Sequence, residues 1–346
     1  MFEGLGANQV TEPLLEAVDL SKIFPVRKGL VFKKTVAEIK AVNHVSFTIG
    51  RNETVALVGE SGSGKTTIAR MVGRLLRPTS GRVLFDGSDA WKLKGDELKN
   101  MRRKIGFVFQ DPFASLNPRM RVRDVVSEPL AIHHLMTKKE REERVRDLLV
   151  RVGLSKDDAT KFPHQFSGGQ LQRIAIARAL ALEPSLIIAD EPVSSLDVSA
   201  QAKIMNLMHQ IQQDLGISYL MISHDLGVVR HVSHAVFVLY LGTIAEVAPA
   251  DEFFQRTLHP YSKALLSAVL VPDPEVLQKR PPQLLKGEIP SPLNLPQGCK
   301  FNTRCPFMQP KCKEEEPPLA PTDSPEHTTA CFYWEPIEKG EIVPRF

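Results

Sequence analysis

Short apolar runs alternate with amphipathic stretches over the first 250 residues of this chain. Strands are predicted at eight runs that are rich in β-branched residues: 14–20, 41–49, 54–58, 82–85, 105–109, 186–189, 218–222 and 236–241. Several of these runs are apolar throughout, which is typical of parallel strands covered by helices on both faces. Helical periodicity is found between them at 66–76, 138–152, 171–182 and 200–215. The alternation predicts an α/β domain.

This pattern changes near residue 255. One more helix is predicted at 262–269, and the remainder has the pattern of irregular chain. Sixteen of the 26 prolines lie in the last 92 residues, and the four cysteines all lie between residues 299 and 331. We therefore predict two units, 1–254 and 255–346, in line with a prior of ~150 residues per domain.

The composition is that of a globular protein. Hydrophobic residues make up 42% and charged residues 24% of the chain, so disorder, collagen and coiled coil are excluded as overall descriptions. The formal net charge of +4 is too small to indicate nucleic acid. The longest apolar runs reach seven residues, as at 235–241, whereas a membrane-spanning helix needs ~20. No secretory signal is visible at 1–6, so we expect a cytosolic chain without disulfides.

A phosphate-binding loop is predicted directly after the strand at 54–58. The segment 59–66 reads Gly-Glu-Ser-Gly-Ser-Gly-Lys-Thr and fits the pattern G-x-x-x-x-G-K-[ST] before a helix. Its glycines allow backbone dihedrals that let N–H groups converge on an anion, and the helix dipole adds to this attraction. Lys65 can reach the terminal phosphates and Thr66 can ligate Mg²⁺. The expected nucleotide-binding residues are Gly59, Ser61, Gly62, Ser63, Gly64, Lys65, Thr66 and Thr67.

Polar side chains also follow three other predicted strands. Asp190 and Glu191 end the apolar run at 186–189, where Asp190 would hold Mg²⁺ through a water and Glu191 would polarise the attacking water. One carboxylate together with Thr66 is enough protein ligation for Mg²⁺. Gln110 and His224 each end another strand, but their spacing alone does not separate a functional role from a structural one.

A second anion site is predicted at 166–170, where Phe-Ser-Gly-Gly-Gln precedes a long helix. A single ATP needs only one such nest. The second is therefore expected to serve a nucleotide held by another chain.

Taken in order, these motifs resemble the ATP-binding subunits of ABC transporters over residues 14–250. The phosphate loop, Gln110, the segment 167–170, the Asp190–Glu191 pair, Ser195-Leu-Asp197 and His224 carry the resemblance. It implies an ABC-type P-loop NTPase, which has a RecA-like core, an antiparallel β subdomain and a helical subdomain at about 111–175. Here a Pro/Cys-rich C-terminal extension would follow.

The resemblance also implies roles for single residues. Two cassettes would enclose each ATP between the phosphate loop of one and Ser167, Gly168, Gly169 and Gln170 of the other. Catalysis would rest on Lys65, on Glu191 as general base and on His224 at the γ-phosphate. Gln110 would sense Mg²⁺ and water, so that Thr66, Gln110 and Asp190 surround the metal. Asp197 would signal across the dimer. Phe24 would stack on adenine, in a loop that the segment 26–40 lengthens.

A closer resemblance is to the oligopeptide/dipeptide importer branch. The matching stretches are 24–30, 110–118, 191–198, 259–262 and the tail. Leu171 and Ser195 depart from the Arg and Ala that are common there, and neither change removes a catalytic group.

The four cysteines Cys299, Cys305, Cys312 and Cys331 are soft ligands that suit zinc or iron–sulfur. Their spacing lacks the paired C-x₂-C of common zinc sites. The resemblance implies a structural 4Fe-4S cluster; zinc and an empty site remain the alternatives.

The function expected from the resemblance is ATP hydrolysis that energises peptide import. The expected partners are a second ATP-binding subunit, which the basic stretch 27–34 suggests is a paralogue, two membrane permeases and, indirectly, an extracytoplasmic solute-binding protein. The chain would lie peripherally on the cytoplasmic face of the membrane, with 111–129 against the permeases.

Three rival interpretations remain. They are import of nickel or an oligosaccharide, a soluble ABC ATPase, and a regulator without turnover.

Overall fold

The computed structural model describes residues 12–28, 34–268 and 287–345. The predictions made for residues 1–6, for the tip of the basic stretch and for the prolines at 272–282 therefore lie outside the described residues. Among the described residues, no helix combines the length and the apolarity that crossing a bilayer requires.

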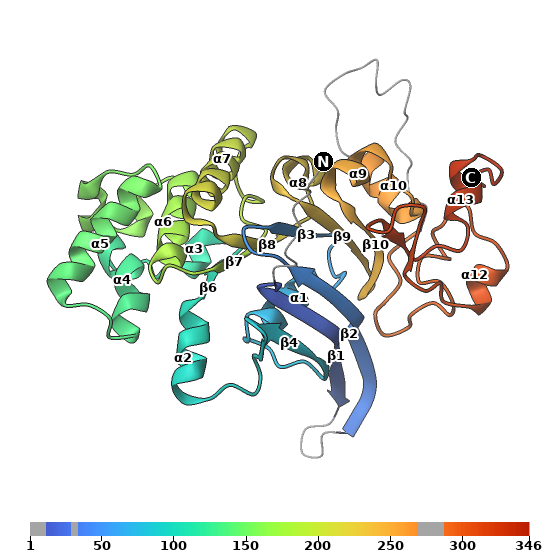
Figure 1. Cartoon of the computed structure of the whole chain (residues 1–346), viewed down its shortest axis with the longest axis horizontal. Helices are drawn as coiled ribbons and strands as arrows, with labels where there is room; N and C mark the ends of the chain where they lie inside the picture. Colours follow the sequence, from blue (N-terminus) through green and yellow to red (C-terminus); the bar gives the residue numbers. More distant parts are fainter. Residues whose placement is uncertain (1–11, 29–33, 269–286, 346) are drawn as a thin grey trace, which may run out of the picture.

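An eight-stranded mixed sheet forms the centre of the molecule, in the order β11-β12-β10-β9-β3-β8-β7-β6 (Figure 1). The five strands from β9 to β6 are parallel, and the other three continue the sheet in antiparallel fashion. Every residue of β3 and β8 is buried, as their uninterrupted apolar pattern predicts. The strands are β3 (Thr54–Val58), β6 (Ile105–Val108), β7 (Leu186–Asp190), β8 (Ser218–Ser223), β9 (Ala235–Tyr240), β10 (Thr243–Pro249), β11 (Ala320–Pro321) and β12 (Thr328–Thr329).

A smaller antiparallel sheet, β2-β1-β4-β5, packs with helix α1 (Lys65–Val72) against one face of the central sheet. Its strands are β1 (Leu15–Lys28), β2 (Lys34–Ile49), β4 (Ser80–Phe85) and β5 (Ser88–Asp89). The prediction that the segment 26–40 lengthens a loop is wrong for most of that segment. Strands β1 and β2 continue as a hairpin in which Phe24 pairs with Ile39 and Val26 with Ala37.

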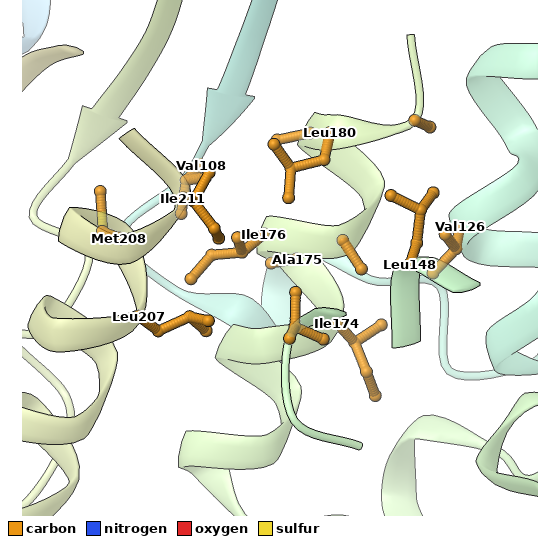
Figure 2. Close-up of a cluster of buried hydrophobic side chains, with 14 of the residues drawn as sticks. Val108, Val126, Leu148, Ile174, Ala175, Ile176, Leu180, Leu207, Met208 and Ile211 are labelled. Carbon is orange, nitrogen blue, oxygen red and sulfur yellow. The ribbon is translucent and has the colours of Figure 1, made fainter. Parts of the chain in front are cut away.

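A helical layer covers the other end of the sheet, and α6 lies at its centre. In Figure 2, Ile174 and Leu180 of α6 lie near Val126 and Leu148 of the outer helices, while Ile176 faces the side chains of α7. The helices here are α2 (Gly95–Arg103), α3 (Pro112–Ser115), α4 (Val122–Ile132), α5 (Lys138–Arg151), α6 (Gly168–Leu180) and α7 (Val198–Leu215), with two 3₁₀ turns, η1 (Lys156–Thr160) and η2 (Pro163–Gln165). The expected α/β architecture with a helical layer and an antiparallel sheet is confirmed.

The C-terminal residues are less irregular than predicted, because they extend the central sheet. Thr328 and Thr329 of β12 pair with Val247 and Glu246 of β10. The helices that pack around this edge are α8 (Leu226–Val232), α9 (Ala250–Gln255), α10 (Pro260–Ser267), α12 (Lys311–Glu314) and α13 (Trp334–Glu338). Two-residue strands leave no hydrophobic alternation that a sequence pattern could detect.

A buried ionic network fastens the C-terminal extension to β10. The His327 ring is fully buried, with Nε2 2.8 Å from Glu246 Oε1 and Nδ1 2.9 Å from Glu252 Oε1. The Glu246 carboxylate also accepts hydrogen bonds from the backbone N–H groups of Leu258 and His259. Burial by itself lowers the pKa of His327, but the hydrogen bonds to Glu246 and Glu252 outweigh burial and raise this pKa above its ordinary value of 6.5.

We expect the substitution His327→Gln to lower the free energy of unfolding by about 2–4 kcal/mol, because it leaves buried carboxylates without their cation. In the wild-type protein this contribution is complete below about pH 6.5, the pKa of an unfolded histidine, and is lost as pH rises through the higher folded-state pKa. Urea unfolding between pH 5.5 and 8.5 tests this. The exposed control His231→Gln should leave the pH slope as in the wild type, and an unchanged slope in His327→Gln would contradict the assignment.

Candidate functional site

The loop that follows β3 has the conformation that anion binding requires. Gly59, Gly62 and Gly64 have φ angles of 149°, 79° and 109°, and helix α1 begins at Lys65. A Cβ atom at Gly64 would lie 2.5 Å from the Ala41 carbonyl oxygen, so strand β2 leaves no room for a side chain there. Ser61 and Gly62 are exposed at the tip of the loop, where a ligand can reach them.

The Lys65 ammonium group is buried inside this loop. Its Nζ donates to the Gly59 and Glu60 carbonyl oxygens at 2.7 and 2.9 Å. Burial lowers the pKa of Lys65, and the negative charges of Glu191, Asp190 and Glu60 oppose that shift. The cation is thus held by two backbone carbonyl oxygens of the loop itself.

Thr66 and Asp190 meet beside the loop. Thr66 Oγ1 donates to Asp190 Oδ1 at 3.1 Å, and both residues line a cleft of about 550 Å³ together with Gln110. Burial raises the pKa of Asp190, while the Thr66 hydroxyl lowers it. A hydroxyl, an amide and one carboxylate are the hard oxygen donors that Mg²⁺ accepts beside its own waters, so these residues fit the ion.

Glu191 lies at the end of β7, between two other predicted site residues. Gln110 Nε2 donates to Glu191 Oε2 at 2.7 Å, and His224 Nδ1 lies 3.3 Å from Glu191 Oε1. The Glu191 backbone has a φ of 48°, and its N–H donates to the Ile222 carbonyl of β8. Three parallel strands therefore bring Gln110, Glu191 and His224 together, as their positions at strand ends predict.

The second predicted anion site lies in a different cleft. Ser167 caps α6 by accepting from the Gln170 N–H at 3.4 Å, and the Gln170 side chain accepts from the Ser167 N–H at 3.0 Å. Ser167, Gly169 and Gln170 line a cleft of about 460 Å³ with Asp197. Gly168 lies beside it, where a Cβ atom would meet Leu196 at 3.3 Å.

Asp197 caps α7 at the other wall of this cleft. Its Oδ1 accepts from the Ala200 N–H at 2.9 Å and from Ser199 Oγ at 2.8 Å. These hydrogen bonds lower the pKa of Asp197, the backbone N–H contributing most. The N-terminus of α7 therefore fixes the position of the Asp197 carboxylate.

Phe24 stands apart from the catalytic groups. Its ring lies on the hairpin with about a third of the residue exposed, and Lys22 Nζ is 5.2 Å from the ring centroid. Thr67 lies in the first turn of α1 and is half-buried.

The four cysteines lie around one small, largely apolar pocket and form no disulfide. Burial raises the pKa of Cys299 to about 11 and that of Cys305 and Cys331 to about 12, so these thiols carry protons at neutral pH unless a cation replaces them. Within the described residues, no group of three or more His, Cys, Asp or Glu side chains is arranged to hold a metal ion. The donor types nevertheless suit a thiolate-bound centre, because the four soft ligands line one pocket that no carboxylate lines.

Two residues at the site, Glu60 and Arg304, are not among the site residues that the sequence predicts. Glu60 of the phosphate loop is bonded by Arg304 and by Tyr261. Arg304 is 244 residues away in the sequence, and nothing in its neighbourhood except two cysteines distinguishes it.

Comparisons with known proteins agree with this geometry. Residues 42–194 match the family model described as "ABC transporter", and residues 245–312 match "Oligopeptide/dipeptide transporter, C-terminal region". The chain is 51% identical to the oligopeptide transport ATP-binding protein AppF of Bacillus subtilis, over 95% of this chain and 99% of that protein. It is 45% identical to the oligopeptide transport ATP-binding protein OppF of Salmonella typhimurium, over 94% and 97% of the two chains.

A solved structure is similar over the cassette. The dimeric ATP-binding cassette MJ0796, in a post-hydrolysis state bound to ADP and Pi, superposes with a TM-score of 0.60 at 33% identity. The match covers 68% of this chain and 98% of that one.

Replacing Gly64 by alanine should abolish the site by steric overlap. We expect Gly64→Ala to lower the free energy of unfolding by at least about 2 kcal/mol, because the alanine would be strained at this positive φ and its Cβ would overlap the Ala41 carbonyl oxygen. We also expect this variant to lose nucleotide binding. The control Gly62→Ala also has a positive φ but meets nothing within 4 Å, so only about 1 kcal/mol of strain is expected. Thermal unfolding of both variants measures the difference, and ATP titration measures the loss of binding in Gly64→Ala; equal losses of stability would show that contact with β2 does not matter.

Proposed function

This chain belongs to the ABC transporter family, in its oligopeptide/dipeptide branch, and from that premise we propose that it binds and hydrolyses ATP to drive peptide import across the cell membrane. The observation that carries the proposal is the meeting of Gln110, Glu191 and His224 at one edge of the sheet, beside the phosphate loop. The names of the relatives AppF and OppF support peptides as the transported substrate.

Each residue contributes a different part of the hydrolysis reaction. Lys65 and the loop N–H groups bind the β- and γ-phosphates, and Lys65 exchanges its bonds to Gly59 and Glu60 for bonds to phosphate oxygens. Glu191 accepts a proton from the attacking water, and Gln110 and His224 orient its carboxylate before the nucleotide arrives. Thr66, Gln110 and Asp190 would hold Mg²⁺, which would supply charge neutralisation at the phosphates.

We propose that the active unit is a pair of cassettes. The cleft at Ser167, Gly169 and Gln170 is distinct from the cleft at Thr66 and Asp190, so each chain offers a lid to a nucleotide in its partner. The dimeric cassette MJ0796 supports this arrangement. The second cassette is proposed to be a paralogue. Asp197 is proposed to signal across the interface, and Phe24 and Thr67 to contact adenine and the α-phosphate.

The remaining partners follow from membership of the family. Two permease subunits would convert closure of the cassettes into transport, with 111–129 as their contact, and a solute-binding protein would deliver the peptide. The chain would then lie peripherally on the cytoplasmic face of the membrane. We also propose that 1–254 acts as the nucleotide-binding unit and 255–346 as an extension specific to this branch.

Within that extension, we propose that Cys299, Cys305, Cys312 and Cys331 hold a structural 4Fe-4S cluster. The support is the convergence of four thiols on one apolar pocket without any carboxylate. Zinc and an empty site are the alternatives. Bound iron would replace the thiol protons that burial otherwise retains.

The substitution Glu191→Gln should reduce ATP hydrolysis by about 10²- to 10⁴-fold while leaving ATP binding intact, because an amide cannot accept the proton of water. A phosphate-release assay and an ATP-binding titration measure the two properties. The matched control is Glu143→Gln on the exposed face of α5, which should turn over at the wild-type rate. Turnover near the wild-type rate in Glu191→Gln would refute its role as base.

Protein purified without oxygen should be brown, absorb near 400 nm and contain about four irons per chain. The variant Cys305→Ser should lose the absorbance and most of the iron. Stoichiometric zinc without iron would reject the cluster in favour of the alternative.

A further inference from the structure

The phosphate loop is bonded directly to the C-terminal extension. Arg304 Nη1 and Nη2 donate to Glu60 Oε2 and Oε1 at 2.6 and 3.0 Å, a two-pronged ion pair in which the Arg304 side chain is only 6% exposed. Such pairs fix position as well as charge. Glu60 is the second residue of the loop, so the pair holds the loop where the phosphates are expected.

The backbone of Glu60 is held as well. Its N–H donates to the hydroxyl of the fully buried Tyr261 at 2.8 Å, and its carbonyl accepts from Lys65 Nζ at 2.9 Å. The side chain, the N–H and the carbonyl of Glu60 each have a partner, and two of the three come from beyond residue 255.

Arg304 in turn is positioned by the turn that carries the cysteines. The N–H groups of Arg304 and Cys305 both donate to the Phe301 carbonyl, at 3.0 and 2.9 Å. The Phe301 ring packs on Tyr240 and Tyr261, with centroids 5.2 and 5.4 Å away. A displacement of this turn therefore moves Arg304 relative to the loop.

The charge of Glu60 makes this link matter for binding. A carboxylate in the loop that receives a polyphosphate repels the ligand, and like charges near one another are strongly unfavourable where water is excluded. Arg304 is the ion-pair partner of Glu60 in the extension and cancels that charge.

We propose that Arg304 is a positioning residue for nucleotide binding: through its ion pair with Glu60 it neutralises and fixes the phosphate loop, and so makes ATP affinity depend on the C-terminal extension. This inference rests on the proposed function, since it needs ATP to bind at the loop. Arg304 acts through Glu60.

The test uses the full-length protein and three variants: Arg304→Gln, the double variant Glu60→Gln with Arg304→Gln, and the control Arg256→Gln. Arg256 also pairs with carboxylates, Asp323 and Glu338, but these lie within the extension. ATP affinity is measured by titration with MgATP, KM and kcat by phosphate release, and folding by thermal unfolding. We expect Arg304→Gln to raise the Kd and KM for ATP roughly tenfold with kcat within about twofold, because an uncompensated carboxylate repels the ligand before any chemistry begins.

The double variant should recover most of the lost affinity, since it removes the carboxylate together with its partner. Arg256→Gln should bind ATP like the wild type. Wild-type affinity in Arg304→Gln, an equal loss in Arg256→Gln, or no recovery in the double variant would each overturn the inference while the proposed function stands. A wild-type protein that bound no ATP would overturn both.

Discussion

The burial of β3 on both faces is the constraint on which the site depends. All five residues of β3 are buried, and the strand ends at Val58, directly before the phosphate loop. The loop that follows is then confined between β2, whose Ala41 carbonyl excludes a side chain at Gly64, and β9, whose Leu239 carbonyl excludes one at Gly59. A loop with glycine at both contacts closes on the Lys65 ammonium group, which donates to the Gly59 and Glu60 carbonyl oxygens.

Parallel strand order then decides which side chains meet. Because β6, β7 and β8 run in the same direction, their carboxyl ends lie at one edge, and Gln110, Glu191 and His224 come together although more than a hundred residues separate the first from the last. The second anion site opens from another layer, at the start of α6, and faces Asp197. A single chain thus carries the two predicted anion sites but does not bring them into one cleft, which supports the proposal that two cassettes act together.

Local patterns were sufficient to predict the central strands, the phosphate loop and the strand-end carboxylates. Each is encoded within about ten neighbouring residues, by uninterrupted apolar runs or by glycine spacing. Strands at 14–20 and 41–49 are predicted, but their continuation as a hairpin through most of 26–40 is not, because basic residues at 27–28 and 33–34 interrupt the apolar run. The contact between Arg304 and Glu60 could not be predicted, because it is a tertiary pairing over 244 residues that depends on the packing of Phe301 against Tyr240 and Tyr261. The cysteines were visible in the sequence, but their convergence on one pocket was not.

The pairing of β12 with β10 has a consequence for how the chain is made. Strand β10 presents one edge to β9, and its other edge pairs with Thr328 and Thr329, about eighty residues further along. The residues that close this edge are therefore synthesised well after the strand itself. Until then the nascent chain exposes unpaired backbone groups, which are a template for association with other strands. Truncation before Thr328 would remove the strand that pairs with Glu246 and Val247, and an unpaired edge of this kind favours association between chains.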